Sequence, residues 1–329
     1  MSPETTPLER RVLGRTGLEV TAVGFGSGGF SRAGLGEGVD HAASMVTQAI
    51  DSGINLIDTA EMYRTEPAVA AGVARSSKRR DEVVITTKVG YRVDGRLRTP
   101  EEIEDALRAR LEALETDYLD VVQLHGLTPE DYEQARDELL PALERQREAG
   151  TLRWVGVTER FRQDRGHETL ARAIADGCWD VVMVGFSLLN QTARERVLEP
   201  AMAANVGTMD MFAVRQALRD LETVSAHLRE RGEAGALPPS VDVEAELAVL
   251  ERQVRSSAVS LPDLAYRFAR AEPGMSTVLM GTGSPDHLRE NLASFTRPLL
   301  SDAVLDELRR FLEGVDVLNG EVAVPKGDF

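Results

Sequence analysis

Short apolar runs alternate along this chain with longer stretches whose apolar residues recur at helical spacing. The apolar runs lie at Val23–Phe25, Ile54–Ile57, Val83–Thr86, Leu119–Leu124, Trp154–Val157, Val181–Val184, Thr208–Met211 and Val278–Met280. The amphipathic stretches lie at Asp40–Ser52, Thr65–Ser77, Pro100–Glu115, Pro129–Ala149, Glu168–Asp176, Ala193–Ala204, Val243–Ser256, Pro262–Ala271 and Pro285–Ser294. A buried strand followed by a helix, repeated about every thirty residues, is the pattern of βα units. Eight such units predict an α/β fold whose parallel sheet closes into a (β/α)8 TIM barrel.

Two segments depart from this repeat. Residues 215–242 lengthen the seventh unit, and Gly232 to Pro239 predicts a turn between helices. Such an insertion is either a lid over the open end of the barrel or a surface excursion, and the sequence favours neither. Residues 301–329 begin with one more amphipathic helix and end in a polar tail. A single barrel domain over residues 1–329 is the simplest organisation for this length.

The composition narrows the class of partner. The formal net charge is -16 and the pI is about 4.9, with no basic stripe, which argues against nucleic acids and anionic membranes. The only cysteine, Cys178, excludes an internal disulfide. No stretch is long and apolar enough to span a bilayer, and the first residues lack the apolar core of a signal peptide, so we expect a cytoplasmic protein. The outer helices show no apolar excess, so a monomer is the default expectation.

Four polar residues end or follow apolar runs: Asp58, Tyr63, Lys88 and His125. Because the carboxyl ends of barrel strands meet at one face, we expect these side chains to lie together. A tyrosine hydroxyl titrates at about 10, and a nearby ammonium lowers that pKa, so Lys88 is expected to make Tyr63 a better proton donor. A buried lysine needs a carboxylate, which Asp58 supplies, and His125 is placed to hold a substrate oxygen beside the phenol. The chain has only three lysines, so a lysine within a strand indicates a functional ammonium.

These residues, in this order and spacing, resemble the Asp-Tyr-Lys-His tetrad of the aldo-keto reductase superfamily. Other phrases also resemble the motifs of that family: RRVLGRTGLEVTAVGFGSG at the start, then DTAEMY, TTKVG, QLHG, RWVGVTE, WDVVMVGFSLLN and MGTGSPDHLRENL. The resemblance covers nearly the whole chain. It implies that residues 9–20 form an opening β-hairpin and that the C-terminal loop helps to form the substrate pocket.

The resemblance also implies a nicotinamide cofactor. Gly26 and Ser27, with Asp58 beside them, are expected against the nicotinamide ribose, because small residues permit close backbone approach. The phosphate end is expected where the last strand leads into a helix, since helix amino termini bind anions. The residues implied there are Gly281, Thr282, Gly283 and Ser284, with Glu290 and Asn291 reaching the adenine.

The choice between the two nicotinamide dinucleotides rests on the same helix. The positions that usually hold a 2′-phosphate read Gly281 and His287, and Arg289 lies nearby. NADP(H) is favoured on family grounds, with NAD(H) as a competitor. After the seventh strand, Met211 or Phe212 replaces the aromatic that stacks on the nicotinamide. Arg215 is also expected among the cofactor contacts.

Three positions depart from the family pattern. The chain has Thr158, Glu159 and Met183 where the family usually has Ser, Asn and Gln, whose side chains bind the nicotinamide carboxamide. A threonine hydroxyl still donates, an ionised carboxylate only accepts, and a thioether is a very weak acceptor. Carboxamide binding is therefore expected to be altered or weakened.

The reaction that the resemblance implies is reversible reduction of an aldehyde, ketone or sugar-like carbonyl by direct hydride transfer, with Tyr63 as general acid. Phe30, Tyr91 and Arg92 follow the first and third strands and are the candidate substrate contacts. Two rivals are a slow cofactor-sensing barrel that acts on a partner protein and a lyase or epimerase that retains its nicotinamide. No role is assigned to the histidines at 41, 167 and 227, which have no partner in the sequence pattern, and no metal is expected because no pair has metal-ligand spacing.

Overall fold

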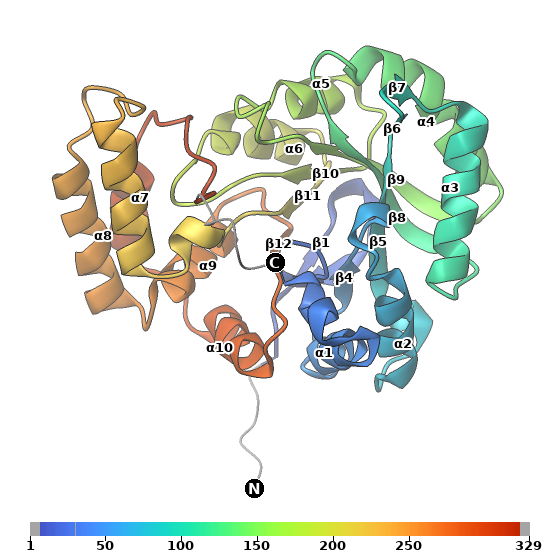
Figure 1. Ribbon diagram of the computed structural model, residues 1–329, viewed down its shortest axis with the longest axis horizontal. Helices are drawn as coiled ribbons and strands as arrows, with labels where there is room; N and C mark the ends of the chain where they lie inside the picture. Colours follow the sequence, from blue (N-terminus) through green and yellow to red (C-terminus); the bar gives the residue numbers. More distant parts are fainter. Residues whose placement is uncertain (1–6, 30, 323–329) are drawn as a thin grey trace, which may run out of the picture.

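The predicted barrel is present. The computed structural model describes residues 7–29 and 31–322. Its central sheet is a closed barrel of parallel strands in which the last strand returns to pair with the first (Figure 1). The strands are β3 (Val23–Gly26), β4 (Leu56–Asp58), β5 (Val84–Gly90), β8 (Leu119–Leu127), β9 (Leu152–Glu159), β10 (Val181–Val184), β11 (Gly207–Asp210) and β12 (Thr277–Met280). Each apolar run of the sequence overlaps one of them.

Helices surround this barrel. They are α1 (Val39–Asp51), α2 (Glu66–Arg75), α3 (Pro100–Ala113), α4 (Tyr132–Glu148), α5 (Glu168–Asp176), α6 (Glu199–Ala203), α7 (Leu221–Glu233), α8 (Val243–Ser257), α9 (Leu261–Ala271), α10 (Pro285–Thr296) and α11 (Asp302–Arg310). The helix expected from Pro129 begins only at Tyr132, because the carboxylate of Asp131 accepts hydrogen bonds from Tyr91 and Arg92 and does not cap the helix.

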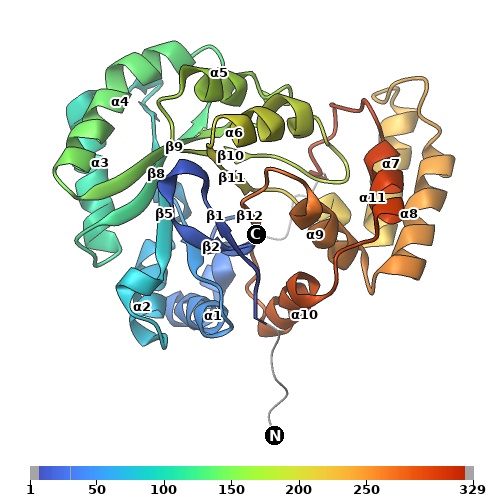
Figure 2. The ribbon, with the colours of Figure 1, turned by 180° about the vertical axis from the view of Figure 1, so that it is seen from behind.

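The expected hairpin closes the amino end of the barrel. β1 (Arg10–Val12) pairs antiparallel with β2 (Glu19–Thr21), and Figure 2 shows the hairpin in front of the barrel. Leu13, Leu18 and Val20 pack on side chains that fill the barrel interior, including Met183 and Met209. A side chain at Gly14 would clash, because a Cβ there would lie 2.2 Å from the backbone nitrogen of Gly207. The hairpin therefore confines access to the opposite end.

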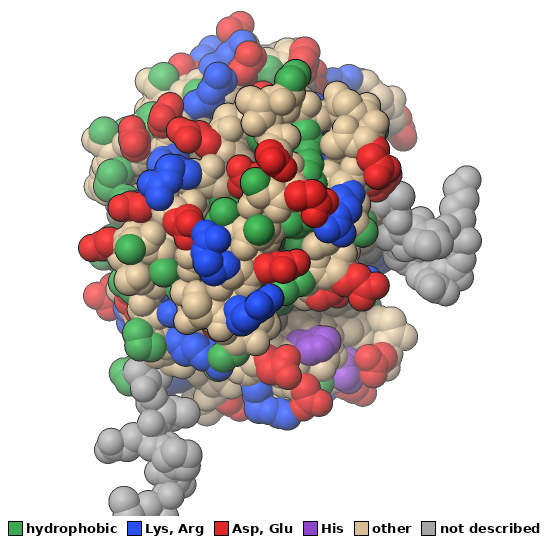
Figure 3. Space-filling model, turned by 90° about the vertical axis from the view of Figure 1, so that its left-hand side faces the viewer, with side chains coloured by type: hydrophobic (Ala, Val, Ile, Leu, Met, Phe, Trp, Pro, Cys, Tyr) green, Lys and Arg blue, Asp and Glu red, His purple; other side chains and the backbone are tan. Residues whose placement is uncertain are grey.

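Most of the insertion at residues 215–242 lies away from the barrel mouth. The segment contains α7, which packs on the following helix α8. Helix α11 also packs on α8, and all three lie outside the barrel (Figures 1 and 2). Figure 3 shows on this side acidic and basic side chains intermixed with separate hydrophobic ones, and Arg229 pairs with Glu244. The pocket at the barrel mouth includes Arg215 and Gln216 but no described residue from 217–242. The position of α7 favours the surface excursion of the two expectations, and the role of this insertion stays a prediction.

The chain after α11 returns to the barrel mouth. The carbonyl of Asn319 accepts a hydrogen bond from Arg215, and that of Gly320 accepts one from the N–H of Ala217. The side chain of Asn190 donates to the carbonyls of Asp316 and Leu318. This tail thus braces the segment that follows β11. In the part of the chain that the structure describes, no helix has the length and apolar character needed to cross a membrane.

Candidate active site

The ion pair between Asp58 and Lys88 lies inside the barrel near its carboxyl end. The register places Asp58 opposite Thr86, so Lys88 projects from β5 toward the end of β4. The Lys88 Nζ lies 2.6 Å from each carboxylate oxygen of Asp58 and 2.9 Å from the carbonyl oxygen of Thr59. Burial favours the neutral amine, but the Asp58 carboxylate and the neighbouring Tyr63 outweigh it and raise the pKa of Lys88 above its usual value. Lys88 is therefore an ammonium at neutral pH.

Tyr63 lies beside this pair. It ends a short 3-10 helix, Glu61–Tyr63, directly after the β4 strand. The Lys88 Nζ lies 5.0 Å from the centroid of the Tyr63 ring. A Cβ at Gly28 would lie 2.4 Å from this ring, so glycine at 28 leaves the room that the phenol occupies. Burial raises the pKa of Tyr63 above its usual value, and the charge of Lys88 opposes this rise in the direction expected of the ammonium. Tyr63 is a neutral phenol and carries the proton that a general acid needs.

His125 completes the group. It lies in β8, and its ring meets the Tyr63 ring edge to face with the centroids 5.7 Å apart. Burial, reinforced by the charge of Lys88, lowers the pKa of His125 to about 3. The imidazole is therefore neutral at physiological pH and has one ring nitrogen able to donate and one able to accept a hydrogen bond.

A neutral His125 gives a testable titration. Its folded pKa of about 3 lies below the ordinary 6.5, so the folded protein binds this proton less readily than the unfolded chain does. The associated stability is present in full above pH 6.5 and declines as the pH falls toward 3. We expect the NMR signals of the His125 ring to stay unchanged between about pH 8 and 5, a range in which a free imidazole changes its charge. His125→Gln assigns the signal, and a His125 midpoint near 6.5 contradicts the buried neutral imidazole.

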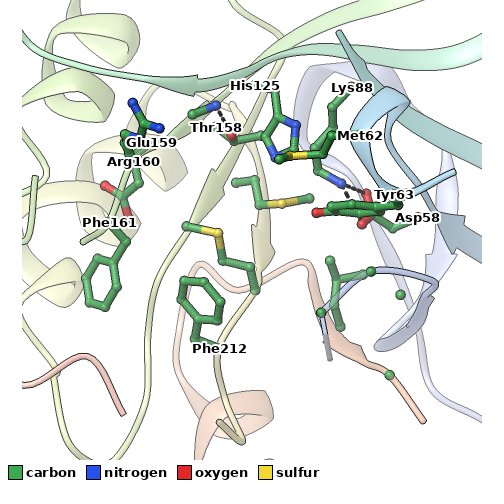
Figure 4. Close-up of a pocket in the computed structure, with 18 of the residues that line it drawn as sticks. Asp58, Met62, Tyr63, Lys88, His125, Thr158, Glu159, Arg160, Phe161 and Phe212 are labelled. Carbon is green, nitrogen blue, oxygen red and sulfur yellow. Dashed lines mark hydrogen bonds and ion pairs between the residues drawn. The ribbon is translucent and has the colours of Figure 1, made fainter. Parts of the chain in front are cut away.

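These four side chains border a pocket of about 990 Å³ at the barrel mouth. Figure 4 shows Asp58, Lys88 and Tyr63 on one side of it, with Arg160 and Phe161 across from them. Of the residues expected to bind the cofactor, those on its wall are Gly26, Asp58, Thr158, Glu159, Met183, Met211, Phe212, Arg215 and Gly281. Ser27 is not on the wall, because its hydroxyl is buried and donates to the carbonyl of Asp58, 3.0 Å away.

Glu159 lines the pocket, but its carboxylate is engaged by neighbouring protein groups. Its buried carboxylate lies 2.8 Å from the Nδ1 of His167 and accepts the N–H of Gly185. The Nε2 of His167 contacts the hydroxyl of Thr192 at 2.9 Å. His167, to which the sequence assigns no role, thus links the segments after β9 and β10 through these contacts. The carboxylate oxygens of Glu159 therefore already have hydrogen-bond partners within the protein.

The segment before α10 is compact. Ser284 caps the helix by accepting the N–H of His287, and the Thr282 hydroxyl accepts the N–H of Ser284. A Cβ at Gly283 would lie 2.7 Å from the Cα of Gly34, so glycine is required there by packing. Another histidine without an assigned role, His41, contributes to this packing through a 2.8 Å contact between its Nε2 and the Gly283 carbonyl.

Farther along α10, the possible phosphate ligand Arg289 forms an ion pair with Asp286. Neither residue lines the central pocket, and the same is true of Thr282, Gly283, Ser284, His287, Glu290 and Asn291. The role of these residues at the adenosine end remains a prediction.

Two of the three expected substrate contacts lie on the pocket wall. Tyr91 and Arg92 line the pocket, and both donate to the carboxylate of Asp131. Phe30 lies outside the described residues. The sequence reasoning missed Arg160, which lines the pocket just after β9, and Glu61, which accepts hydrogen bonds from the backbone of Gly90 and from Arg98. No periodic pattern marks either residue, since both follow strands in irregular segments.

The pocket floor suits a flat aromatic ring. A Cβ at Gly26 would meet no atom closer than 3.8 Å, so the backbone there is open to the pocket. The Thr158 hydroxyl accepts the N–H of Gly126 at 2.7 Å, which leaves its own proton free to donate to a carboxamide. Phe212 is held by a hydrogen bond from its N–H to Asp210, and the Arg215 guanidinium lies 4.1 Å from its ring centroid. These residues fit a nicotinamide with fewer carboxamide contacts than the resemblance alone implies.

Comparisons with known proteins agree with this geometry. The family model described as "Aldo/keto reductase family" matches residues 22–313. L-galactose dehydrogenase from Arabidopsis thaliana is 26% identical over 94% of this chain and 96% of its own length. D-threo-aldose 1-dehydrogenase from Pseudomonas sp is 27% identical over 84% and 89%. Among solved structures, aldo-keto reductase AKR11C1 from Bacillus halodurans in its holo form has a TM-score of 0.72 at 23% identity, over 97% of this chain and 98% of that one. The chain therefore belongs to the aldo/keto reductase family of oxidoreductases.

Proposed function

We propose that this protein reversibly reduces an aldehyde, ketone or sugar-like carbonyl to an alcohol with a nicotinamide dinucleotide. The observation that carries the proposal is the group formed by the buried Lys88–Asp58 pair, Tyr63 and His125 at the only end of the barrel that the hairpin leaves open. The names of the two dehydrogenase relatives support the reaction class and point toward sugar-like substrates.

Each member of the group has a distinct role in this reaction. A bound reduced nicotinamide supplies the hydride. Tyr63, neutral through burial, donates its proton to the oxygen on which charge develops. Lys88 stabilises the phenolate that results, because its ammonium stays charged beside Asp58. His125, a neutral imidazole, orients the carbonyl oxygen toward Tyr63.

Turnover tests the proposal directly. The protein is incubated with NADPH or NADH and a panel of aldehydes, ketones and aldoses, and the loss of reduced nicotinamide is followed with the alcohol product. The expected result is stoichiometric reduction of at least one carbonyl class. Nicotinamide that is retained through dialysis without net oxidation indicates a lyase or epimerase instead.

We infer that the cofactor is NADP(H) on family grounds, against the competing NAD(H), and the Arg289–Asp286 ion pair makes this inference testable. A 2′-phosphate near α10 meets the charge of Asp286, so Asp286→Ala is expected to free Arg289 and raise the affinity for NADPH by about tenfold relative to NADH. Parallel fluorescence titrations of the native protein and Asp286→Ala with NADPH and with NADH measure the ratio of the two affinities. An unchanged ratio removes Arg289 from the cofactor site.

A further inference from the structure

Arg160 is fixed at the mouth of the pocket by its backbone. It follows directly after β9, its N–H donates to the carbonyl of Leu127 at 3.1 Å, and its own carbonyl accepts the N–H of Gln163 at 2.7 Å. The root of the side chain is thus held in place, while the guanidinium borders the pocket. The backbone position of Arg160 is therefore set by the end of β9 and not by a long loop.

Arg160 differs from the other arginines on the pocket wall because no acidic side chain of the described residues pairs with it. The other arginines on the pocket wall each pair with an acid: Arg92 with Asp131 at 2.7 Å, Arg98 with Glu61 at 2.9 Å, and both Arg162 and Arg215 with Glu321. Among the residues that the structure describes, no carboxylate forms an ion pair with Arg160 and no acceptor takes a hydrogen bond from its guanidinium. Arg160 is an exposed residue at the rim of the pocket, so its guanidinium is accessible to a molecule that enters there.

The guanidinium also lies within electrostatic reach of the chemistry. Its charge contributes to lowering the pKa of His125. It acts in the same direction on the pKa of Tyr91, whose net rise is due first to burial. Figure 4 places Arg160 across the pocket from Tyr63. A molecule whose carbonyl meets Tyr63 and His125 can therefore extend toward Arg160.

We propose that Arg160 binds a carboxylate of the substrate, so that the preferred substrates are aldehyde or keto acids, including sugar acids. This inference rests on the proposed reductase function and names its substrate class. The planar fork of a guanidinium matches a carboxylate in two parallel hydrogen bonds. A phosphate is a poorer match, because one free guanidinium offsets a single charge and a phosphate carries about -1.5 to -2 at pH 7.

Matched substrate pairs test this inference. The pairs are para-formylbenzoate with its methyl ester and D-galacturonate with D-galactose, each differing at the carboxylate and retaining the carbonyl. For each pair the ratio of kcat/KM for the acid to kcat/KM for the neutral partner is measured in the native protein and in Arg160→Gln. We expect the ratio to fall about ten- to a hundredfold in Arg160→Gln, the range for one charge-assisted hydrogen-bonded pair. Intrinsic differences in reactivity cancel, because both proteins are compared on the same molecules.

Arg165→Gln is the matched control, since it removes the same charge from an exposed residue of the same loop that is not on the pocket wall. Its ratio should equal that of the native protein. An equal ratio in the native protein and Arg160→Gln overturns the inference and leaves the reductase function intact. A loss of NADPH or NADH affinity in Arg160→Gln with an unchanged ratio assigns Arg160 to the cofactor and also overturns it. If the native protein reduces neither the acids nor their neutral partners with either nucleotide, the reductase proposal itself fails.

Discussion

Replacing Tyr63 by phenylalanine is expected to lower kcat for carbonyl reduction by roughly 10² to 10⁴-fold, the range for removal of a positioned general acid. The change removes only the phenolic oxygen, so the ring can still pack against Gly28 and His125. Nucleotide affinity, read by fluorescence titration, separates a lost proton donor from a collapsed pocket. Steady-state kcat with the best carbonyl of the panel gives the catalytic effect.

Tyr118→Phe provides the control for this variant. Tyr118 directly precedes β8 and is not on the pocket wall, and its ring packs under the guanidinium of Arg80 with 4.3 Å between the guanidinium carbon and the ring centroid. Loss of this hydroxyl should leave kcat unchanged. If Tyr63→Phe turns over as fast as the native protein, the acid must be another group, and the proposed mechanism is wrong.

The second large effect is expected from Asp58→Asn, and it concerns folding as well as chemistry. Lys88 is 1% exposed, and its charge is balanced by the Asp58 carboxylate at 2.6 Å. Neutralising Asp58 leaves an ammonium buried without its counter-charge, which typically costs about 3 to 5 kcal/mol. Urea unfolding should show a free energy of unfolding lower by that amount, together with strongly reduced turnover.

The double variant Asp58→Asn/Lys88→Met separates these two effects. Methionine has a length similar to the lysine stem and carries no charge, so it should restore most of the stability lost in Asp58→Asn. Turnover should remain low, because no ammonium is left to stabilise the phenolate. If Asp58→Asn alone is as stable as the native protein, Lys88 releases its proton when residue 58 is neutral. That result would contradict a persistent ammonium at Lys88.

Much of the fold could be predicted because burial follows the apolar pattern directly. β10 occupies Val181–Val184 as expected, and α5 occupies Glu168–Asp176 as expected. The strands before and after them shift by a residue or two, since hydrogen bonding to neighbours decides where a strand ends. The packing of the insertion was not predictable in the same way. The apolar pattern predicts bounds for the helix that is α8 and a turn at Gly232 to Pro239, but neither the bounds of α7 nor the surface on which these helices pack.

The identity of the residues at the candidate site could be predicted from the sequence, but the surroundings of each side chain could not. The positions of Asp58, Tyr63, Lys88 and His125 follow from the strand ends. The pKa of Tyr63 does not, because desolvation depends on every atom packed around the phenol. The Glu159–His167 contact was also hidden, since His167 turns inward from a left-handed conformation with φ 58°, which no spacing rule encodes.

The hairpin at the amino end has a kinetic consequence. With Leu13 and its neighbours filling that end of the barrel, everything that reaches the floor of the pocket must pass the same mouth and leave by it. In the proposed reaction, a reactant seated deeper would have to arrive first and depart last, so initial-rate kinetics are expected to show ordered rather than random addition. Product release, governed by how fast the deeper occupant escapes past the tail segment around Asn319, then becomes a natural limit on the number of catalytic cycles per second.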